Sequence, residues 1–266
     1  EEIVQSFNHI ELCMGTGFRF QGASPLESDA TDHALQIACA ILHEADAIFS
    51  LYKPESPLSL LAAGKTSVAE CSPVVSEIWD ACEAWSKKTD GWFSAFTPEH
   101  TFDPSGLVKT WAARRAAESL IDAGITDFTM NAGGDVYVAD QASGDLDWRI
   151  GLSKPVSIAS PDAGALAVLN LKGTEFRAVA TSGSAERGAH IWNPKALGQQ
   201  PAGELVQVSV VARDLVEADI WATAAFAEGL ASMARIDREP HLEALAILAD
   251  GQMAATPGLT ALIAKD

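Results

Sequence analysis

Apolar residues recur at the helical spacing of i, i+3, i+4 and i+7 in three stretches of the first half of the chain. The first stretch predicts a helix over about residues 32–49. The second predicts a helix that begins after Ser72, a good N-cap, with Pro73 at its first position, and ends near Gly91. The third predicts a helix over residues 105–122 that ends at Gly124.

Short apolar runs separated by Gly, Asp and Asn predict strands through much of the remaining chain. These runs cover residues 3–21, with a turn at 14–17, and residues 128–130, 136–138, 148–152, 167–171, 177–181 and 206–212. Further helices are expected at about 215–230, 242–248 and 259–265. The pattern predicts an α+β fold over residues 1–266, a single domain with mostly antiparallel sheet flanked by helices.

The net charge of −18 narrows the range of partners. A strongly acidic surface repels nucleic-acid backbones and anionic lipid headgroups, so we expect neither nucleic acid nor a membrane as a partner. An acidic protein that handles a polyphosphate needs a cation or aligned backbone N–H groups. A divalent metal is the simplest way to meet that need.

The four cysteines are widely spaced, without a C-x-x-C pair, and do not predict a zinc site. His33 and His43 are ten residues apart, which does not match metal-ligand spacing either. Cys39 and Cys82 fall on apolar helix faces and are expected to be buried free thiols. Reduced thiols and the lack of a membrane-spanning run favour a cytoplasmic protein, or a periplasmic or exported one if a signal peptide has been removed.

Asp219 and Thr223 are four residues apart on a predicted helix, so their oxygen atoms lie one turn apart on the same face. Hard oxygen donors suit Mg²⁺. The alternative is an acidic residue near the helix N-terminus and a Thr that bonds back to a helix carbonyl. The spacing by itself favours this structural alternative over a Mg²⁺ site.

Residues 131–135, Asn-Ala-Gly-Gly-Asp, lie between two predicted strands. Paired glycines allow an anion-binding nest, but they also suit an ordinary hairpin turn. The segment does not match G-x-G-x-x-G, and no helix follows it, so a Rossmann site is excluded. His190 lies in a loop of small and polar residues, where it is either structural or a base for a hydroxyl nucleophile.

Eight short segments follow one another in an order that resembles the ApbE family over about residues 12–230. They are Met14-Gly15-Thr16, residues 49–56, residues 89–93, residues 103–109, residues 131–135, residues 180–183, residues 190–194 and residues 218–224. Each segment is weak evidence alone, but their common order makes the resemblance strong.

The resemblance implies a bacterial-type flavin transferase that moves FMN from FAD to a Ser or Thr hydroxyl of an acceptor flavoprotein subunit and releases AMP. It implies a Mg²⁺ site formed by Asp219, Thr223 and the backbone carbonyl of Val108. His190 would be the base for the acceptor hydroxyl. The implied FAD contacts are Met14, Tyr52, Trp92, Phe93, Ala132, Gly133, Gly134, Asp135 and Ser182.

Three departures from the family pattern concern the flavin and adenosine contacts more than the metal. Ser94 stands where the family usually has Asp. Residues 109–114 read Lys-Thr-Trp-Ala-Ala-Arg in place of Lys-Gly-Tyr-Ala-x-Asp, and the stretch between Phe93 and Asp103 is short. Two alternatives therefore stay open: a Mg²⁺-dependent FAD pyrophosphatase that yields FMN and AMP, and a non-catalytic FAD-binding protein.

Overall fold

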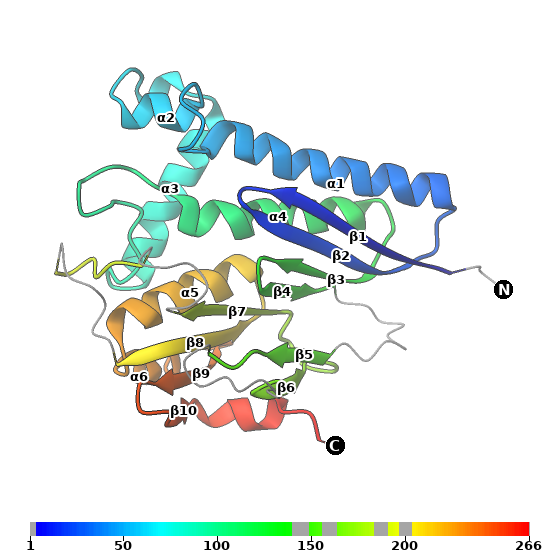
Figure 1. The fold of residues 1–266 in the computed structure, drawn as a ribbon, viewed down its shortest axis with the longest axis vertical. Helices are drawn as coiled ribbons and strands as arrows, with labels where there is room; N and C mark the ends of the chain where they lie inside the picture. The colour runs from blue at the N-terminus through cyan, green and yellow to red at the C-terminus, as the bar shows by residue number, and fades with distance from the viewer. Residues whose placement is uncertain (1–3, 140–148, 156–163, 184–190, 197–203, 266) are drawn as a thin grey trace. The chain divides into compact units, whose positions relative to one another are not determined.

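The computed structural model describes residues 4–139, 149–155, 164–183, 191–196 and 204–265 (Figure 1). The chain forms two compact units. The first contains Glu1–Trp85 and Ala95–Leu146, and the second contains Ser86–Ser94 and Asp147–Asp266. Each unit has strands and helices of its own, and the single domain over residues 1–266 stays a prediction.

The first unit contains four antiparallel strands in the order β1-β2-β3-β4. They are β1 (Gln5–Cys13), β2 (Thr16–Ser24), β3 (Asp127–Ala132) and β4 (Asp135–Val138). Phe18 and Phe20 on β2 pair with Ala132 and Met130 on β3, and all four are fully buried. This period of two places one face of the strands in the core, as the alternating sequence predicts.

Helices α1 (Ser28–Phe49) and α4 (Ser105–Asp122) pack against each other and contact β1 and β3 (Figure 1). The bounds of α4 match the prediction, and α1 begins at Ser28 rather than at about residue 32. Helix α3 (Pro73–Lys88) begins at the predicted proline. Two short helices that the pattern did not predict are α2 (Pro57–Ala62) and the 3₁₀ turn η1 (Val68–Glu70).

The second unit contains antiparallel strands in the order β7-β8-β9-β10 and a separate pair, β5-β6. The strands are β5 (Arg149–Leu152), β6 (Ala167–Asn170), β7 (Ala178–Gly183), β8 (Leu205–Ala212), β9 (Glu243–Leu248) and β10 (Met253–Ala255). Helix α5 (Leu215–Glu228) packs on β7 and β8, and α6 (Ser232–Ile236) follows it. The mixed α+β fold with antiparallel strands is confirmed.

The helix expected at 242–248 is wrong, because this segment forms strand β9. Its residues Ala244–Ile247 are all buried, since β9 lies between β8 and β10. A continuous apolar run is compatible with either a buried helix or a buried strand, and pairing on both sides decides for the strand. The helix expected at 259–265 is instead the 3₁₀ segment η2 (Pro257–Leu262).

Among the residues that the structure describes, no helix combines the length and the apolar character needed to cross a bilayer.

Candidate functional site

Two tight hairpin turns in the first unit carry predicted site residues. Met14-Gly15 connects β1 to β2, and Gly133-Gly134 connects β3 to β4. All four residues have positive φ, at 51° and 70° in the first turn and 61° and 102° in the second. Positive φ at both central positions is typical of the turns that match the twist of paired strands. For Met14, this left-handed conformation is strained, and such strain often accompanies a functional position.

The two turns are linked to each other. The amide of Gly133 donates a hydrogen bond of 3.0 Å to the carbonyl of Gly17. A Cβ atom on Gly133 would lie 2.5 Å from the hydroxyl oxygen of Thr16, so glycine is required there by close approach as well as by φ. The first and fifth family segments therefore form one local structure in the first unit.

The hairpin interpretation of residues 131–135 is confirmed, because Ala132 and Asp135 are paired across the turn. The Gly134 amide donates a 2.8 Å hydrogen bond to the side-chain oxygen of Asn131. With the amides of Gly133 and Gly134 both bonded to protein oxygens, an anion nest at this turn would require these bonds to break. Close backbone approach is the contribution that this turn can make to binding a ligand.

Asp135 forms a buried ion pair with Lys109 of α4. The side chains of Lys109 and Asp135 are 7% and 3% exposed, and the lysine ammonium donates to Asp135 Oδ2. Paired charges at this depth are costly to separate. Asp135 was predicted to contact FAD and Lys109 was given no role, although both lie in the family segments. The two residues are 26 positions apart, and no sequence spacing indicates their pairing.

The departures at residues 109–114 are accommodated inside the first unit. Trp111 is 7% exposed, stacks edge-on against Phe49 at 6.0 Å, and donates from its indole nitrogen to Glu77 Oε1 at 3.1 Å. Arg114 forms an i,i+4 contact of 3.5 Å with Glu118 on the same helix. Trp111 therefore fills core volume in the first unit.

Tyr52, a predicted flavin contact, lies in the turn between α1 and α2 and is 94% exposed. Ser56 holds this turn together, because its hydroxyl donates to the Ser50 carbonyl at 2.7 Å and accepts from the Ser59 amide at 3.0 Å. The ring therefore projects from an ordered turn with nearly its whole surface available.

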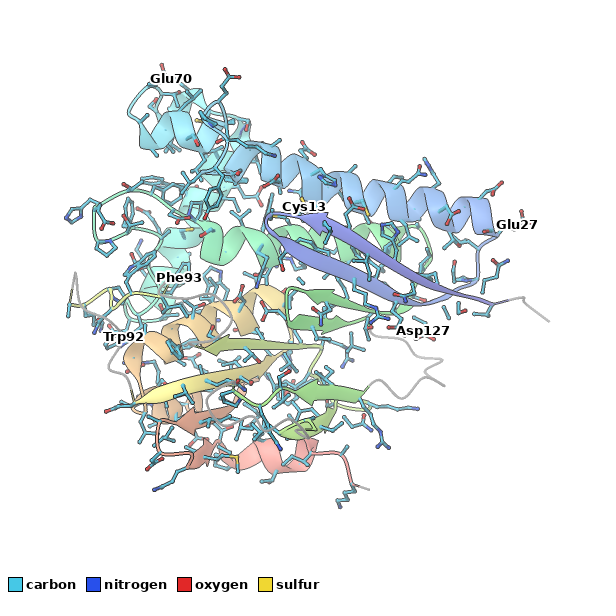
Figure 2. The ribbon with its side chains drawn as sticks, viewed as in Figure 1. Cys13, Glu27, Glu70, Trp92, Phe93 and Asp127 are labelled. Atoms are coloured by element: carbon cyan, nitrogen blue, oxygen red, sulfur yellow. The ribbon has the colours of Figure 1, made fainter. Side chains whose placement is uncertain are left out.

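In the second unit, Trp92 and Phe93, labelled in Figure 2, follow Asp90 and Gly91, which both have positive φ. Lys195 links this segment to residues 191–194: its ammonium lies 4.6 Å from the centre of the Trp92 ring and 3.0 Å from Asp90 Oδ2. This arrangement is a cation–π contact supported by an ion pair. The third and seventh family segments thus meet through Lys195, a residue that sequence reasoning missed because it follows the recognised segment.

Phe93 is 2% exposed, and its amide donates to the buried hydroxyl of Thr89 at 3.0 Å. Its ring belongs to the core, whereas Trp92 is partly exposed. Of Trp92 and Phe93, Trp92 is the one whose ring has surface available to a ligand.

Asp219 and Thr223 lie one turn apart on α5, as predicted. The helix is capped by Asp214, whose carboxylate accepts from the Glu217 amide at 3.1 Å. Asp219 is 5% exposed, and Thr223 is partly exposed. The helix therefore presents a carboxylate and a hydroxyl together from a surface that is otherwise apolar and buried.

The remaining predicted residues fall in three places. Val108 is buried in the first turn of α4, in the first unit. Ser182 is 8% exposed on β7, where it pairs with Val208 of β8. His190 lies outside the described residues.

The donors proposed for the metal fit Mg²⁺ in kind. A carboxylate, a hydroxyl and a backbone carbonyl are all hard oxygen ligands, and Mg²⁺ is commonly bound by one or two protein groups together with substrate phosphates. Asp219 and Thr223 already share one face of one helix, so they need no rearrangement of α5 to act together.

The family model described as "ApbE family" matches residues 95–246. Two proteins of Klebsiella pneumoniae (strain 342), both named FAD:protein FMN transferase, are 28% identical over 141 residues and 25% identical over 163 residues. The matches cover 50% and 58% of this chain, but 40% and 45% of those proteins. The chain thus spans less than half the length of each.

Solved structures show the same fold at low identity. The ApbE protein of Thermotoga maritima matches with a TM-score of 0.81 at 18% identity, over 98% of this chain and 100% of that one. The flavin transferase ApbE of Vibrio cholerae matches with a TM-score of 0.79 at 17% identity, over 98% of this chain and 100% of that one. With a family model that covers more than half of its length, the chain belongs to the ApbE family.

Proposed function

We propose that this chain is an FAD:protein FMN transferase, which moves FMN from FAD to a Ser or Thr hydroxyl of an acceptor protein and releases AMP. Membership of the ApbE family supports this proposal, as do the names of the two Klebsiella relatives. FAD is then the substrate, Mg²⁺ the metal, and an acceptor flavoprotein subunit the partner.

The observation that carries the proposal is the pair Asp219 and Thr223 on α5. A carboxylate at 5% exposure beside a hydroxyl one turn away is a hard oxygen donor set, and it lies on the helix that matches the family's metal segment. The net charge of −18 favours a bound cation as the partner of a pyrophosphate. Bound Mg²⁺ would offset the charge that builds up on the pyrophosphate oxygens during transfer.

The chain's own residues would supply the rest. Trp92 offers a partly exposed ring held in place by Lys195, which suits stacking on a flavin. His190 would take the proton from the acceptor hydroxyl as its oxygen attacks the FMN phosphorus. The bond between that phosphorus and the bridging oxygen breaks, and AMP leaves with that oxygen.

The experiment measures AMP release from FAD and covalent flavin on an acceptor protein with an exposed Thr, each with Mg²⁺ or with EDTA. Covalent flavin that appears together with AMP, and only with Mg²⁺, supports the transferase. Asp219→Asn keeps the shape of the side chain and should remove both signals, whereas the exposed Asp237→Ala should leave them unchanged.

Two outcomes would contradict the proposal in different ways. Free FMN and AMP at the same rate with or without acceptor, with no flavin attached to it, would identify a pyrophosphatase. Tight FAD binding without AMP under any condition would identify a flavin-binding protein, for which the changes at Ser94 and Arg114 would be the first places to look.

A further inference from the structure

Five potential metal ligands gather between strand β1 and helix α1 in the first unit. His9, Glu11 and Cys13 occupy alternate positions of β1 and therefore point to the same face of the strand. Cys39 and His43 are one turn apart on α1 and point to the same side of that helix. The contacts described below show that the two sets face each other.

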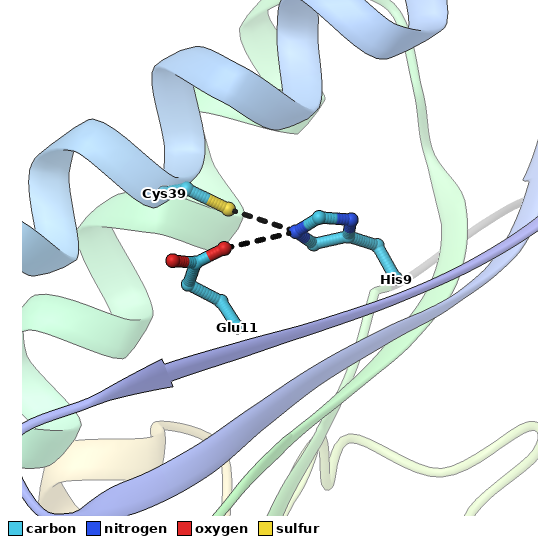
Figure 3. A group of neighbouring side chains, drawn as sticks. All are labelled: His9, Glu11 and Cys39. Carbon is cyan, nitrogen blue, oxygen red and sulfur yellow. Dashed lines mark hydrogen bonds and ion pairs between the residues drawn. The ribbon is translucent and has the colours of Figure 1, made fainter.

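Three of these side chains converge on one point. His9 Nε2 lies 3.2 Å from Glu11 Oε2 and 3.3 Å from Cys39 Sγ (Figure 3). All three ligand atoms lie within 4.8 Å of one another. In a tetrahedral site, metal–ligand bonds of 2.0–2.3 Å place neighbouring ligand atoms about 3.3–3.8 Å apart. The distances from His9 Nε2 to the other two ligand atoms are already close to this ligand–ligand distance.

The other two residues support this group. His43 Nε2 lies 2.6 Å from Glu11 Oε1, the carboxylate oxygen that does not contact His9. His43 Nδ1 lies 3.6 Å from Cys13 Sγ. A ligating carboxylate held by a hydrogen bond to its second oxygen is a common feature of protein metal sites, because that bond fixes the orientation of the ligand.

We propose that His9, Glu11 and Cys39 form a binding site for a divalent transition-metal ion, with Zn²⁺ as the ion that fits best. Imidazole, carboxylate and thiolate together are the donors of borderline-soft ions, whereas Mg²⁺ and Ca²⁺ take oxygen ligands. The site lies wholly in the first unit and uses none of the residues proposed for Mg²⁺ or FAD.

The exposure of the three ligands suits entry and exchange of an ion. Cys39 is 8% exposed, and the side chains of His9 and Glu11 are 38% and 25% exposed. The thiol thus lies at the bottom of the group and the other donors lie nearer to water. Three protein ligands leave a fourth position for water or for a movement of His43, and the bound ion would fasten β1 to α1.

The competing interpretation is a hydrogen-bonded polar cluster that never binds an ion. The two differ in the state of the thiol. Burial raises the pKa of Cys39 to about 12, with the negative charge of Glu11 adding to the effect, so the thiol keeps its proton when no cation is present. A metal replaces that proton, and the resulting metal–thiolate bond has its own absorption.

The test uses the full chain without a polyhistidine tag, reduced, and in excess Mg²⁺ so that hard oxygen sites are filled. Zn²⁺ is titrated with a competing chelator to obtain Kd and stoichiometry, and Co²⁺ is added as a spectroscopic probe of thiolate ligation. Variants Cys39→Ser and His9→Asn remove one ligand each. Cys71→Ser and His33→Ala are matched controls, because both residues are outside the cluster and His33 lies exposed on α1.

We expect one Zn²⁺ per chain, a Kd that rises at least about 10- to 100-fold in each ligand variant, and no change in the controls. The Co²⁺ complex should show thiolate charge transfer that Cys39→Ser abolishes. Equal Zn²⁺ affinity in the native chain and in both ligand variants, with circular dichroism showing that all are folded, would overturn the site. Absence of thiolate charge transfer in the native chain would exclude Cys39 as a ligand.

Glu11→Gln is a second way to break the site with little change of shape. It removes the charge that the ion requires and keeps a hydrogen-bonding side chain beside His9 and His43. Loss of Zn²⁺ affinity in this variant, with FAD-dependent AMP release unchanged, is expected. A parallel loss of AMP release would show that the ion serves the flavin reaction and not a separate site.

Discussion

One ion pair in each unit illustrates a different use of opposite charges. In the first unit, Lys109 and Asp135 form an ion pair whose side chains are 7% and 3% exposed. In the second, Lys195 and Asp90 form a pair whose side chains are 41% and 67% exposed, and the lysine also lies over Trp92. Separation of a buried pair typically costs about 3–5 kcal/mol, whereas an exposed pair contributes about 0–1 kcal/mol.

This difference separates residues that hold the fold from residues that are available to a ligand. In the first unit, the buried pair joins α4 to β4, and the neighbouring Gly133-Gly134 turn is held by hydrogen bonds from its two backbone amides. In the second unit, Lys195 lies over the partly exposed ring of Trp92, and Asp219 and Thr223 share one face of α5. Substitution of Lys109 should therefore lower stability, and substitution of Asp219 should lower activity at nearly constant stability.

The largest expected effect is on activity in the second unit. Asp219→Asn should reduce Mg²⁺-dependent AMP release at least about 1,000-fold, because metal stabilisation of developing charge is worth several kcal/mol. The urea midpoint should stay close to that of the native chain, since volume and shape are kept. Steady-state AMP release and urea unfolding on the same preparation measure both quantities. Retained activity would remove Asp219 from the metal site.

The next largest effect is on stability, and it is measured by removing the lysine from each of the two ion pairs. Lys109→Met leaves Asp135 buried without its ammonium partner and should lower the free energy of unfolding by about 3 kcal/mol. Lys195→Met is the matched control at the exposed pair and should change it by less than about 0.5 kcal/mol. Urea unfolding measures both. Equal losses would show that burial does not distinguish the pairs.

A smaller effect on stability is expected in the two hairpin turns, where two glycine substitutions distinguish a steric clash from backbone strain. Gly133→Ala introduces a Cβ 2.5 Å from Thr16 Oγ1 at a φ of 61°, so we expect a loss of about 2 kcal/mol. Gly15→Ala has a φ of 70° with nothing within 4 Å, so its loss should be limited to about 1 kcal/mol. Thermal unfolding of both variants gives the difference. If Gly15→Ala is as damaging, close approach to Thr16 is not the constraint.

The smallest effect is a dependence of stability on pH in the cluster between β1 and α1. The pKa of Glu11 is lowered from its usual 4.5, first by the hydrogen bond with His43 and further by those with His9 and Cys39. A carboxylate whose pKa is lower in the folded than in the unfolded state stabilises the fold at pH values above its unfolded-state pKa. This stabilisation is lost as the pH falls through the folded-state pKa. Between pH 5 and 3 the native chain should therefore lose more stability than Glu11→Gln, by less than about 1 kcal/mol because the group is partly exposed. Parallel curves would contradict this contribution.

Many helices and turns of the fold were predictable because they depend on residues that are close together in the sequence. The period of α4, the Ser72-Pro73 start of α3 and the glycine turns correctly predicted helices and hairpins from neighbouring residues. The segment 242–248 was not predictable in the same way. Its composition suits a helix as well as a buried strand, and the neighbours that decide, β8 and β10, come from elsewhere in the chain.

The candidate site also has a part that was predictable from the sequence and a part that was not. That Asp219 and Thr223 share one helix face was predictable from their spacing, but only the resemblance to the family, whose model covers more than half of the chain, assigned them to a metal. The contact of Lys195 with Trp92 joins residues that are far apart in the sequence, and so does the pairing of Lys109 with Asp135. Neither contact has a spacing that a sequence pattern could show.

The sequence by itself determined the family, the α+β class and the oxygen pair on α5, because these depend on order, period and a spacing of one helical turn. Tertiary structure decided which charges are buried together and which side chains converge on His9. The widely spaced cysteines and the distant His33 and His43 had argued against a soft-metal site. Folding brings alternate positions of β1 against one turn of α1, so potential metal ligands from two elements lie close together although they are far apart in the sequence.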